Sequence, residues 1–269
     1  MQALRVSLIQ GATRWHDPVG NREYYRALMA PLRGQTDLCV LPETFTSGFS
    51  NDAIHSAEKM DGPTVDWIRA QSKTLGAAVA GSVQLRVDGP SGINVYNRLL
   101  FATPDGDVKH YDKRHLFRYA GEHERYSGGT ERLIVEWNGW RICPLVCYDL
   151  RFPIWIRNRV EASAKQFDYD VVLFVANWPS ARAHAWRTLL MARAMENLSY
   201  CVGLNRVGTD GNNLHYGGQS AVLDFLGQPL VELGAQEQVV TAALSRDALT
   251  AHRERFPAWM DADEYRIGI

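Results

Sequence analysis

The segment Arg141–Pro153, RICPLVCYDLRFP, carries the pattern on which the fold prediction rests. Its first half is apolar and predicts a buried strand that ends near Val146. Cys147 follows directly, and Pro153 then favours the first turn of a helix. A side chain at the carboxyl end of a strand, before a helix, lies in the crevice where α/β proteins bind ligands. Cys147 is therefore the first candidate for a functional residue.

Strand-like apolar segments alternate with helical segments along most of the chain, which is typical of an α/β fold of mixed sheets covered by helices. No internal repeat, low-complexity tract or linker divides the sequence, so we expect one domain across 1–269. The expected helices cover residues 18–33, 63–75 and 181–197, and another begins near 153. The expected strands cover residues 4–10, 37–41, 77–83, 94–101, 132–137, 140–146, 170–176, 199–205 and 218–223, with paired strands between 230 and 244.

Three stretches interrupt this alternation. The turn Thr103–Asp107, TPDGD, predicts a hairpin, which gives the sheet antiparallel parts. The segment 113–130 is polar and contains glycine, and a loop of that length inside a domain is usually functional. The C-terminal tail, 251–269, is rich in charged and aromatic residues without a clear amphipathic period. We expect this tail to lie on the surface or against a partner subunit.

Composition and charge exclude several classes of protein. Of the 269 residues, 46% are hydrophobic and 22% are charged, which is ordinary for a globular chain. The net charge is -1 and the basic residues are scattered, so the partner is expected to be a small molecule and not nucleic acid. The N-terminus lacks the pattern of a signal peptide, and no apolar run is long enough to span a membrane. We therefore expect a soluble, cytoplasmic protein.

Four cysteines do not form a disulfide framework in a chain of this size. Cys39 and Cys201 lie within apolar runs, where cysteine usually packs as a small hydrophobic residue, and Cys143 precedes a proline inside a strand. Cys143 and Cys147 have C-x3-C spacing, but apolar residues separate them and no second Cys/His pair has zinc-finger spacing. A metal site is therefore disfavoured, and Cys147 remains the candidate for a reactive thiol.

A thiol that attacks a carbonyl needs a group to move its proton and a group to stabilise the oxyanion. No histidine occurs in a cysteine-protease signature. Glu43 and Lys113 each follow a predicted strand, as Cys147 does. Alone, Glu43 would be an ordinary loop acid and Lys113 a solvated charge. Together, the three side chains could converge at one end of the sheet and hydrolyse an amide.

Three motifs resemble the nitrilase, or carbon-nitrogen hydrolase, superfamily and occur in that family's order. They are LPETFTSGF at Leu41–Phe49, YDKRHLF at Tyr111–Phe117 and CYDLRFP at Cys147–Pro153. The resemblance implies a four-layer αββα sandwich with two mixed sheets, assembled as a homodimer or larger homo-oligomer. It also implies a catalytic Glu-Lys-Cys triad without a metal or organic cofactor.

Longer motifs resemble the bacterial omega-amidase branch of this family. They cover Lys113–Gly129, Cys147–Asn158 and Ala176–Gly208. The resemblance implies hydrolysis of the terminal amide of 2-oxo dicarboxylic acid monoamides such as 2-oxoglutaramate and 2-oxosuccinamate. Other members of the family remain alternatives, namely N-carbamoyl amidohydrolases, aliphatic amidases and nitrilases. An inactive scaffold with the same fold is a further alternative.

The resemblance assigns a role to each residue of the predicted site. Cys147, held as a thiolate beside Lys113, attacks the amide carbon, and Glu43 protonates the departing ammonia and later activates water. Lys113 and the backbone N–H of Tyr148 stabilise the oxyanion. The resemblance also implies a second glutamate, Glu122, which orients Lys113. Glu124, two residues further on, is the alternative match to this second glutamate.

The remaining candidates concern substrate binding. A distal carboxylate on the substrate calls for an arginine. Asn177 and Trp178 follow the predicted strand 170–176 and are expected at the same end of the sheet, with Trp178 as a pocket wall. In the helix 181–197, the apolar residues are expected to contact the core or another subunit. The arginines in or near the motif loops are Arg118, Arg125, Arg151 and Arg206, of which Arg118 and Arg151 are the candidates for the substrate site.

Overall fold

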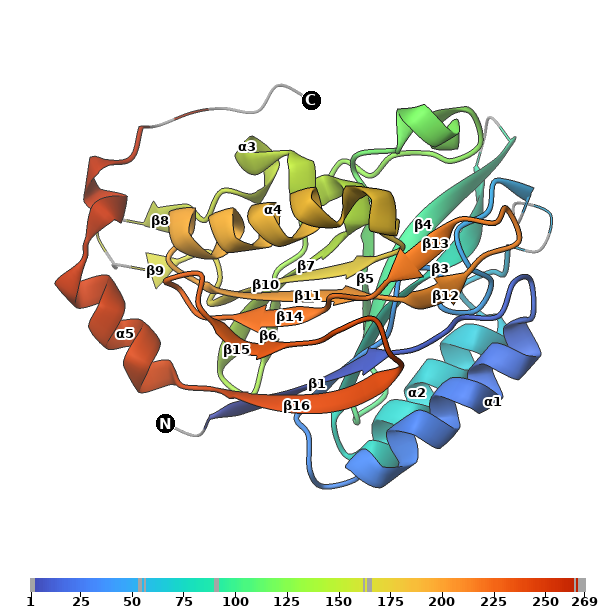
Figure 1. The fold of residues 1–269 in the computed structure, drawn as a ribbon, viewed down its shortest axis with the longest axis horizontal. Helices are drawn as coiled ribbons and strands as arrows, with labels where there is room; N and C mark the ends of the chain where they lie inside the picture. The colour runs from blue at the N-terminus through green and yellow to red at the C-terminus, as the bar shows by residue number, and fades with distance from the viewer. Residues whose placement is uncertain are drawn as a thin grey trace.

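Two six-stranded sheets lie face to face, and helices cover their outer sides (Figure 1). The computed structural model describes residues 3–263, apart from residues 53, 54, 56, 90, 91, 162, 164 and 165, and also Tyr265. Helices α1 and α2 form one outer layer, and α3 and α4 form the other. The order of layers is therefore αββα, as the family resemblance implied.

The first sheet has the strand order β16-β1-β2-β3-β4-β5. Its strands β1, β2 and β3 are parallel, and β16, β4 and β5 make antiparallel pairs with their neighbours. The predicted TPDGD turn joins β4 to β5, which confirms the hairpin. The strand bounds are β1 Leu4–Gln10, β2 Leu38–Val40, β3 Ala78–Gly89, β4 Gly92–Ala102, β5 Val108–Asp112 and β16 Gln238–Leu244.

The second sheet has the order β15-β14-β11-β10-β7-β6. Here β7, β10 and β11 are parallel, and the outer strands pair antiparallel to them. Both sheets are therefore mixed. The strand bounds are β6 Val135–Trp137, β7 Trp140–Val146, β10 Val171–Ala176, β11 Tyr200–Asn205, β14 Ala221–Leu223 and β15 Pro229–Glu232, and two small separate hairpins pair β8 Val160–Glu161 with β9 Gln166–Phe167 and β12 Val207–Thr209 with β13 His215–Gly217.

The helices begin and end where the local sequence directs. Asp17 caps α1 by accepting the N–H of Gly20 at 2.8 Å. The predicted helix 18–33 changes to a short 3₁₀ turn after α1, because Pro31 cannot donate the next helical hydrogen bond. Gly76 ends α2 in the left-handed conformation, with φ 67°. The helix bounds are α1 Pro18–Met29, α2 Pro63–Leu75, α3 Pro153–Ile156, α4 Ala183–Glu196 and α5 Arg246–Arg255.

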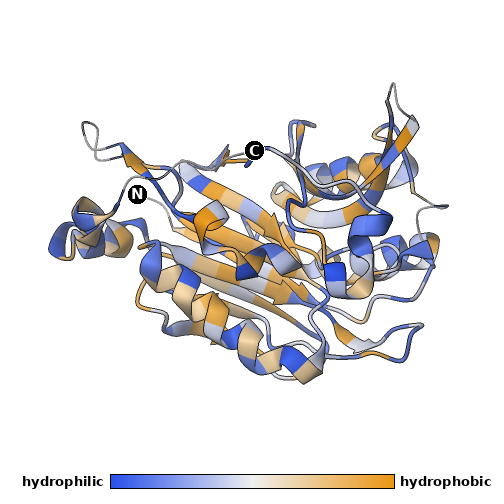
Figure 2. Ribbon diagram, turned by 90° about the horizontal axis from the view of Figure 1, so that it is seen from above, coloured by the Kyte–Doolittle hydropathy of each residue, from blue (hydrophilic) through white to orange (hydrophobic). Residues whose placement is uncertain are grey.

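The main apolar core fills the space between the two sheets and continues under α4 on the outer side of the second sheet, and a second apolar cluster lies between the first sheet and α1 and α2. Figure 2 shows the strands as a band of hydrophobic residues, whereas the helices alternate between apolar and polar residues. In α4, Trp186, Leu190 and Ala194 are buried against this core. The prediction that this apolar face contacts the core is thus confirmed.

Two predictions near the C-terminus are wrong. The strands expected to pair within 230–244 belong to different sheets, because β15 lies at the edge of the second sheet and β16 at the edge of the first. The beginning of the expected irregular tail continues the helix α5. Leu249 and His252 are buried on one side of this helix, within a mainly charged sequence. Residues 264 and 266–269 of the tail lie outside the described residues.

Within the residues that the structure describes, none of the helices combines the length and the apolar character that a membrane crossing needs.

Candidate active site

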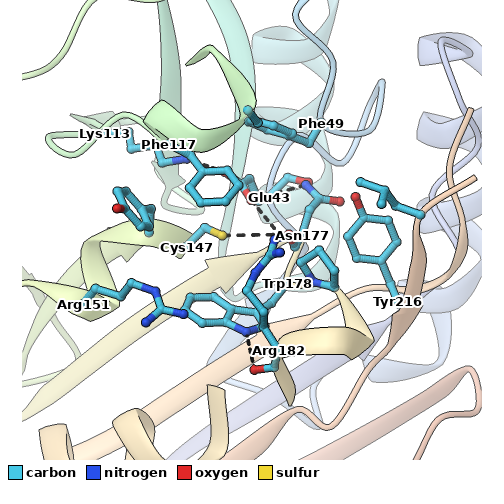
Figure 3. Close-up of a pocket in the computed structure, with 14 residues that line it drawn as sticks. Glu43, Phe49, Lys113, Phe117, Cys147, Arg151, Asn177, Trp178, Arg182 and Tyr216 are labelled. Atoms are coloured by element: carbon cyan, nitrogen blue, oxygen red, sulfur yellow. Dashed lines mark hydrogen bonds and ion pairs between the residues drawn. The ribbon is translucent and has the colours of Figure 1, made fainter. Parts of the chain in front are cut away.

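Glu43, Lys113 and Cys147 line one pocket, although they are far apart in the sequence (Figure 3). Lys113 directly follows β5 and Glu43 lies shortly after β2, so both come from the first sheet. Cys147 directly follows β7 of the second sheet. The packing of the two sheets therefore brings these strand ends together at one site.

Lys113 lies between two carboxylates. Its Nζ is 3.0 Å from Glu43 Oε1 and 2.9 Å from both carboxylate oxygens of Glu122. Lys113 is 1% exposed, and both glutamates are fully buried. Glu122 also accepts the backbone N–H of Phe117 within the loop 113–130. The side chain of Glu124, by contrast, is 69% exposed, so Glu122 is the second glutamate of this cluster.

Asn97 is a member of the cluster that the sequence analysis missed. Its amide nitrogen donates to Glu43 Oε1 at 2.8 Å and lies 3.4 Å from Glu122 Oε1. Its amide oxygen accepts the hydroxyl of Ser82 at 2.8 Å. The only available signal was a polar residue near the middle of an apolar strand, here β4, a position where an amide needs buried partners.

Asn177 fixes Glu43 from the second sheet. Its backbone N–H donates to Glu43 Oε2 at 2.7 Å. Its side-chain amide donates to the Glu43 carbonyl oxygen and to the Thr44 hydroxyl, both at 2.9 Å. Together with Asn97 and Lys113, these donors surround the Glu43 carboxylate and restrict it to one orientation.

The buried charges change each other's proton affinity. Burial alone would lower the pKa of the Lys113 ammonium, but the carboxylates of Glu122 and Glu43 outweigh this effect and raise it. Burial raises the pKa of Glu122, and the charge of Glu43 raises it further, whereas Lys113 opposes the rise. Lys113 thus remains a cation, and Glu122 is the carboxyl group whose ionisation burial penalises.

Cys147 has a strained backbone, with φ 44°. This left-handed conformation costs free energy for any residue other than glycine. It is tolerated where the surrounding structure enforces it, and it is enriched at functional sites. Burial and the Glu43 charge raise the pKa of the Cys147 thiol well above its usual value, although Lys113 opposes this. Burial and the Glu43 charge therefore favour the protonated thiol over the resting thiolate that the sequence analysis expects. Its sulfur lies 3.9 Å from the carbonyl oxygen of Asn177.

Asp149 anchors the turn that carries Cys147. One carboxylate oxygen accepts the Val146 N–H at 3.1 Å and the Tyr111 hydroxyl at 2.9 Å. The other accepts the His115 N–H at 3.0 Å. Asp149 is fully buried, and its partners flank both Cys147 and Lys113 in the sequence. This carboxylate therefore ties the two loops together.

Aromatic and cationic side chains form the rest of the pocket. Trp178 lines it, as predicted for a pocket wall, and so does Tyr148. Arg151 also lines the pocket, and its guanidinium carbon lies 5.0 Å from the Trp178 ring centroid. Further lining residues that the sequence analysis did not select are Phe49, Phe117, Ala120, Pro179, Arg182, Leu214 and Tyr216.

The other predicted arginines lie outside this pocket. Arg118 and Arg125 are exposed in the loop 113–130 and do not line it. Arg206 is 1% exposed, and its guanidinium donates to the carbonyl oxygens of Val207 and Thr13. These bonds hold Arg206 within the fold and away from the pocket lining. Arg182, which the sequence analysis missed, takes a place in the lining instead.

Within the described part of the chain, no group of three or more His, Cys, Asp or Glu side chains is placed to hold a metal ion. The pocket instead combines a buried carboxylate, an ammonium and a thiol. These are the three kinds of group that cysteine-dependent amide hydrolysis requires: a proton carrier, an oxyanion stabiliser and a nucleophile.

Comparisons with known proteins agree with this chemistry. Omega-amidase YafV of Escherichia coli (strain K12) is 46% identical over 268 residues, which cover 99% of this chain and 100% of that protein. The 2-oxoglutaramate amidase of Bacillus subtilis (strain 168) is 34% identical over 228 residues, which cover 84% of each protein.

A solved structure has the same fold over the full length. The crystal structure of XC1258 from Xanthomonas campestris, a CN-hydrolase superfamily protein with an arsenic adduct in its active site, is 64% identical. It covers 100% of both chains with a TM-score of 0.97. The family model for carbon-nitrogen hydrolases matches residues 5–254. This chain therefore belongs to the carbon-nitrogen hydrolase family of enzymes.

Proposed function

We propose that this enzyme hydrolyses the terminal amide of 2-oxo dicarboxylic acid monoamides, such as 2-oxoglutaramate and 2-oxosuccinamate, to the acid and ammonia. The observation that carries the proposal is the shared pocket of Glu43, Lys113 and Cys147. The names of the relatives, omega-amidase and 2-oxoglutaramate amidase, support the choice of substrate. In this proposal the three side chains act as a catalytic triad.

The first half-reaction forms a thioester. Cys147 transfers its proton to Glu43 as the sulfur attacks the amide carbon, which agrees with the raised pKa of this buried thiol. The Lys113 ammonium and the backbone N–H of Tyr148 stabilise the oxyanion. The C–N bond then breaks, and Glu43 gives its proton to the departing nitrogen. Ammonia leaves, and the acyl group remains on the sulfur.

The second half-reaction consumes water. Glu43 removes a proton from the water molecule as its oxygen attacks the thioester carbon. When the tetrahedral intermediate collapses, the C–S bond breaks and the sulfur recovers the proton from Glu43. The carboxylic acid leaves, and the enzyme returns to its starting state.

Glu122 and Asn97 act as positioning residues in this scheme. Glu122 holds Lys113 with two contacts of 2.9 Å, opposite the Glu43 contact of 3.0 Å. Asn97 donates to Glu43 on the same oxygen that Lys113 contacts. Both residues therefore limit the directions that the proton carrier and the ammonium can take.

An ammonia-release assay tests the proposal. Wild-type enzyme and Cys147→Ser are assayed with 2-oxoglutaramate, carbamoyl-β-alanine and a simple nitrile. We expect the oxo-acid amide to have the highest kcat/KM, and Cys147→Ser to abolish its turnover. Cys39→Ala is the matched control, because Cys39 is fully buried within β2 and does not line the pocket.

Two results would reject the proposed substrate. A higher kcat/KM for the carbamoyl compound or the nitrile would assign the enzyme to another activity of the family. Absence of ammonia from all three compounds, with Cys147 intact by mass spectrometry, would favour the inactive scaffold.

Three predictions about the setting of the enzyme accompany this proposal. We expect a homodimer or larger homo-oligomer, with the C-terminal tail at a subunit contact; the exposed Phe256 and Met260 of that tail support this. We also expect a cytoplasmic location and one domain that unfolds cooperatively. Sedimentation velocity, cell fractionation and urea unfolding followed by two probes test these three predictions in turn.

A further inference from the structure

Two arginines at the pocket lack an anionic partner. Arg151 and Arg182 line the pocket, yet no carboxylate among the described residues lies within 4.0 Å of either guanidinium. The carboxylate of Glu43, by contrast, is already surrounded by donors from Lys113, Asn97 and Asn177. The pocket therefore has an excess of positive charge on the side away from Lys113, which favours an anionic group on the ligand.

The two arginines differ in how firmly they are held. The carbonyl oxygen of Arg182 accepts the indole N–H of Trp178 at 2.8 Å, which fixes the turn that carries it. The Arg182 guanidinium carbon lies 5.2 Å from the Phe117 ring centroid and 6.0 Å from that of Tyr119. Arg151 is exposed and contacts the Trp178 ring. Arg182 thus has two flanking rings and a partly buried side chain, whereas Arg151 has one ring contact and is exposed.

The surroundings of Arg182 suit a carboxylate. Figure 3 shows its side chain extending from the turn beside Trp178 toward Phe117, in the same region as Cys147 and Asn177. Aromatic rings that contact a guanidinium through their faces leave its in-plane N–H groups available. Those N–H groups match the two oxygens of a carboxylate and bind it with charge-assisted hydrogen bonds. Partial burial of Arg182 strengthens such a bond, because less water competes for it.

We propose that Arg182 binds the substrate carboxylate at the end of the molecule opposite the scissile amide, and so determines the preference for acidic amides. This inference rests on the proposed function, since it assumes that the substrate carries such a carboxylate. Arg182 then selects between substrates, and Glu43, Lys113 and Cys147 perform the chemistry. An amide without this carboxylate cannot pair with the guanidinium, so Arg182 does not increase the affinity of the enzyme for it.

Matched substrates and variants test this role. Arg182→Gln, Arg182→Lys and Arg151→Gln are assayed with 2-oxoglutaramate and with pentanamide, a neutral amide with the same number of carbons. We expect Arg182→Gln to lower kcat/KM for 2-oxoglutaramate by about 10- to 100-fold, mainly through KM, and to leave pentanamide hydrolysis near the wild-type rate. Arg182→Lys should lower kcat/KM for 2-oxoglutaramate less than Arg182→Gln does. Arg118→Gln, an exposed arginine outside the pocket, is the control.

An alkylation experiment reads the positive charge of Arg182 at the pocket without turnover. Iodoacetate carries a carboxylate and iodoacetamide does not, and both alkylate a thiol with release of iodide. We expect Arg182→Gln to slow the alkylation of Cys147 by iodoacetate and to leave the iodoacetamide rate unchanged. The unchanged iodoacetamide rate also shows that the variant is folded.

The outcomes separate this inference from the proposed function. If wild-type enzyme does not hydrolyse 2-oxoglutaramate, the proposed function fails, and the alkylation ratio alone decides whether Arg182 binds anions. If wild-type enzyme is active and Arg182→Gln keeps its KM, the role of Arg182 is overturned while the function stands. The role of Arg182 is also overturned if only Arg151→Gln lowers kcat/KM for 2-oxoglutaramate. It is overturned as well if Arg182→Gln lowers kcat/KM equally for both amides.

Discussion

Asn177 donates its backbone N–H to the Glu43 carboxylate at 2.7 Å and its side-chain amide to the Glu43 carbonyl oxygen at 2.9 Å. Asn177 follows β10 of the second sheet, and Glu43 follows β2 of the first. These bonds therefore join the two sheets at the proposed proton carrier. The orientation of Glu43 depends on how the sheets pack, and not only on its own loop.

Asn177→Ala should lower activity more than its effect on stability explains. The variant leaves the Glu43 carbonyl oxygen without its donor and lets the Glu43 loop move. We expect a free-energy cost of about 1–3 kcal/mol in urea unfolding and a clear fall in kcat. Asn158→Ala is the control, because Asn158 makes comparable buried bonds to Tyr169 and Asn197 away from the pocket. Equal kcat in the two variants would show that Asn177 has only a structural role.

The four cysteines should react very differently with iodoacetamide. Cys39, Cys143 and Cys201 are fully buried, whereas Cys147 is partly accessible and lines the pocket. Peptide mass spectrometry at neutral pH should find the label on Cys147 first. Equal labelling of the four cysteines would remove the case for a distinct thiol at this site.

Glu43→Gln should have opposite effects on alkylation and turnover. The Glu43 charge raises the pKa of the Cys147 thiol, so its removal should lower that pKa and shift the pH midpoint of alkylation downward. Amide hydrolysis should be lost, because glutamine cannot carry the proton. The rate of iodoacetamide labelling against pH measures the first effect, and ammonia release measures the second. An upward shift of the alkylation midpoint would contradict the electrostatic role of Glu43.

The sequence predicted the parts of the site that follow strand ends. Glu43 and Cys147 each come after an apolar run, and Lys113 follows the second strand of the predicted hairpin; these local patterns, together with the family motifs, were enough to predict that the three meet at one end of the sheets. Asn97 lies within a strand, and its partners Ser82 and Glu43 become visible only when the strands pair. The role of a polar residue inside a strand can therefore be assigned only when the fold is known.

Long-range packing also explains the wrong predictions. Arg206 lies in a motif that resembles the family, but the fold uses its guanidinium to bind backbone carbonyl oxygens. Arg182 lies in the same motif, and its place in the pocket depends on the turn that carries it, whose carbonyl oxygen accepts the indole N–H of Trp178. The predicted pairing of β15 with β16 was wrong for the same reason, because two strands that are adjacent in the sequence can belong to different sheets.

Glu122→Gln should change how stability depends on pH. The folded state raises the pKa of Glu122 above its unfolded value, so the folded protein binds the proton more tightly than the unfolded chain does. The contribution of Glu122 to the free energy of unfolding is therefore largest at acidic pH. It is lost as the pH rises from the pKa of the unfolded chain through the higher pKa of the folded state. Urea unfolding between about pH 4 and pH 7 should show a fall in wild type that is smaller in Glu122→Gln. A steeper fall in the variant would contradict the predicted sign.

Tyr111→Phe should weaken the connection between the loops of Lys113 and Cys147. The variant loses the hydroxyl that donates to Asp149 at 2.9 Å and leaves the indole N–H of Trp155 without its acceptor. We expect a cost of about 1–3 kcal/mol in the free energy of unfolding, because Tyr111 and Asp149 are buried. We also expect a lower kcat, since Asp149 anchors the turn that begins at Cys147.

The matched control for this substitution is Tyr119→Phe, because the Tyr119 side chain is 87% exposed and its hydroxyl reaches water. Urea unfolding and 2-oxoglutaramate hydrolysis are measured on both variants. Equal unfolding free energies for the two would mean that the Tyr111 hydroxyl contributes nothing to stability. A destabilised Tyr111→Phe enzyme with unchanged kcat would mean that the Cys147 turn keeps its geometry without this bond, because Val146 and His115 still donate to Asp149.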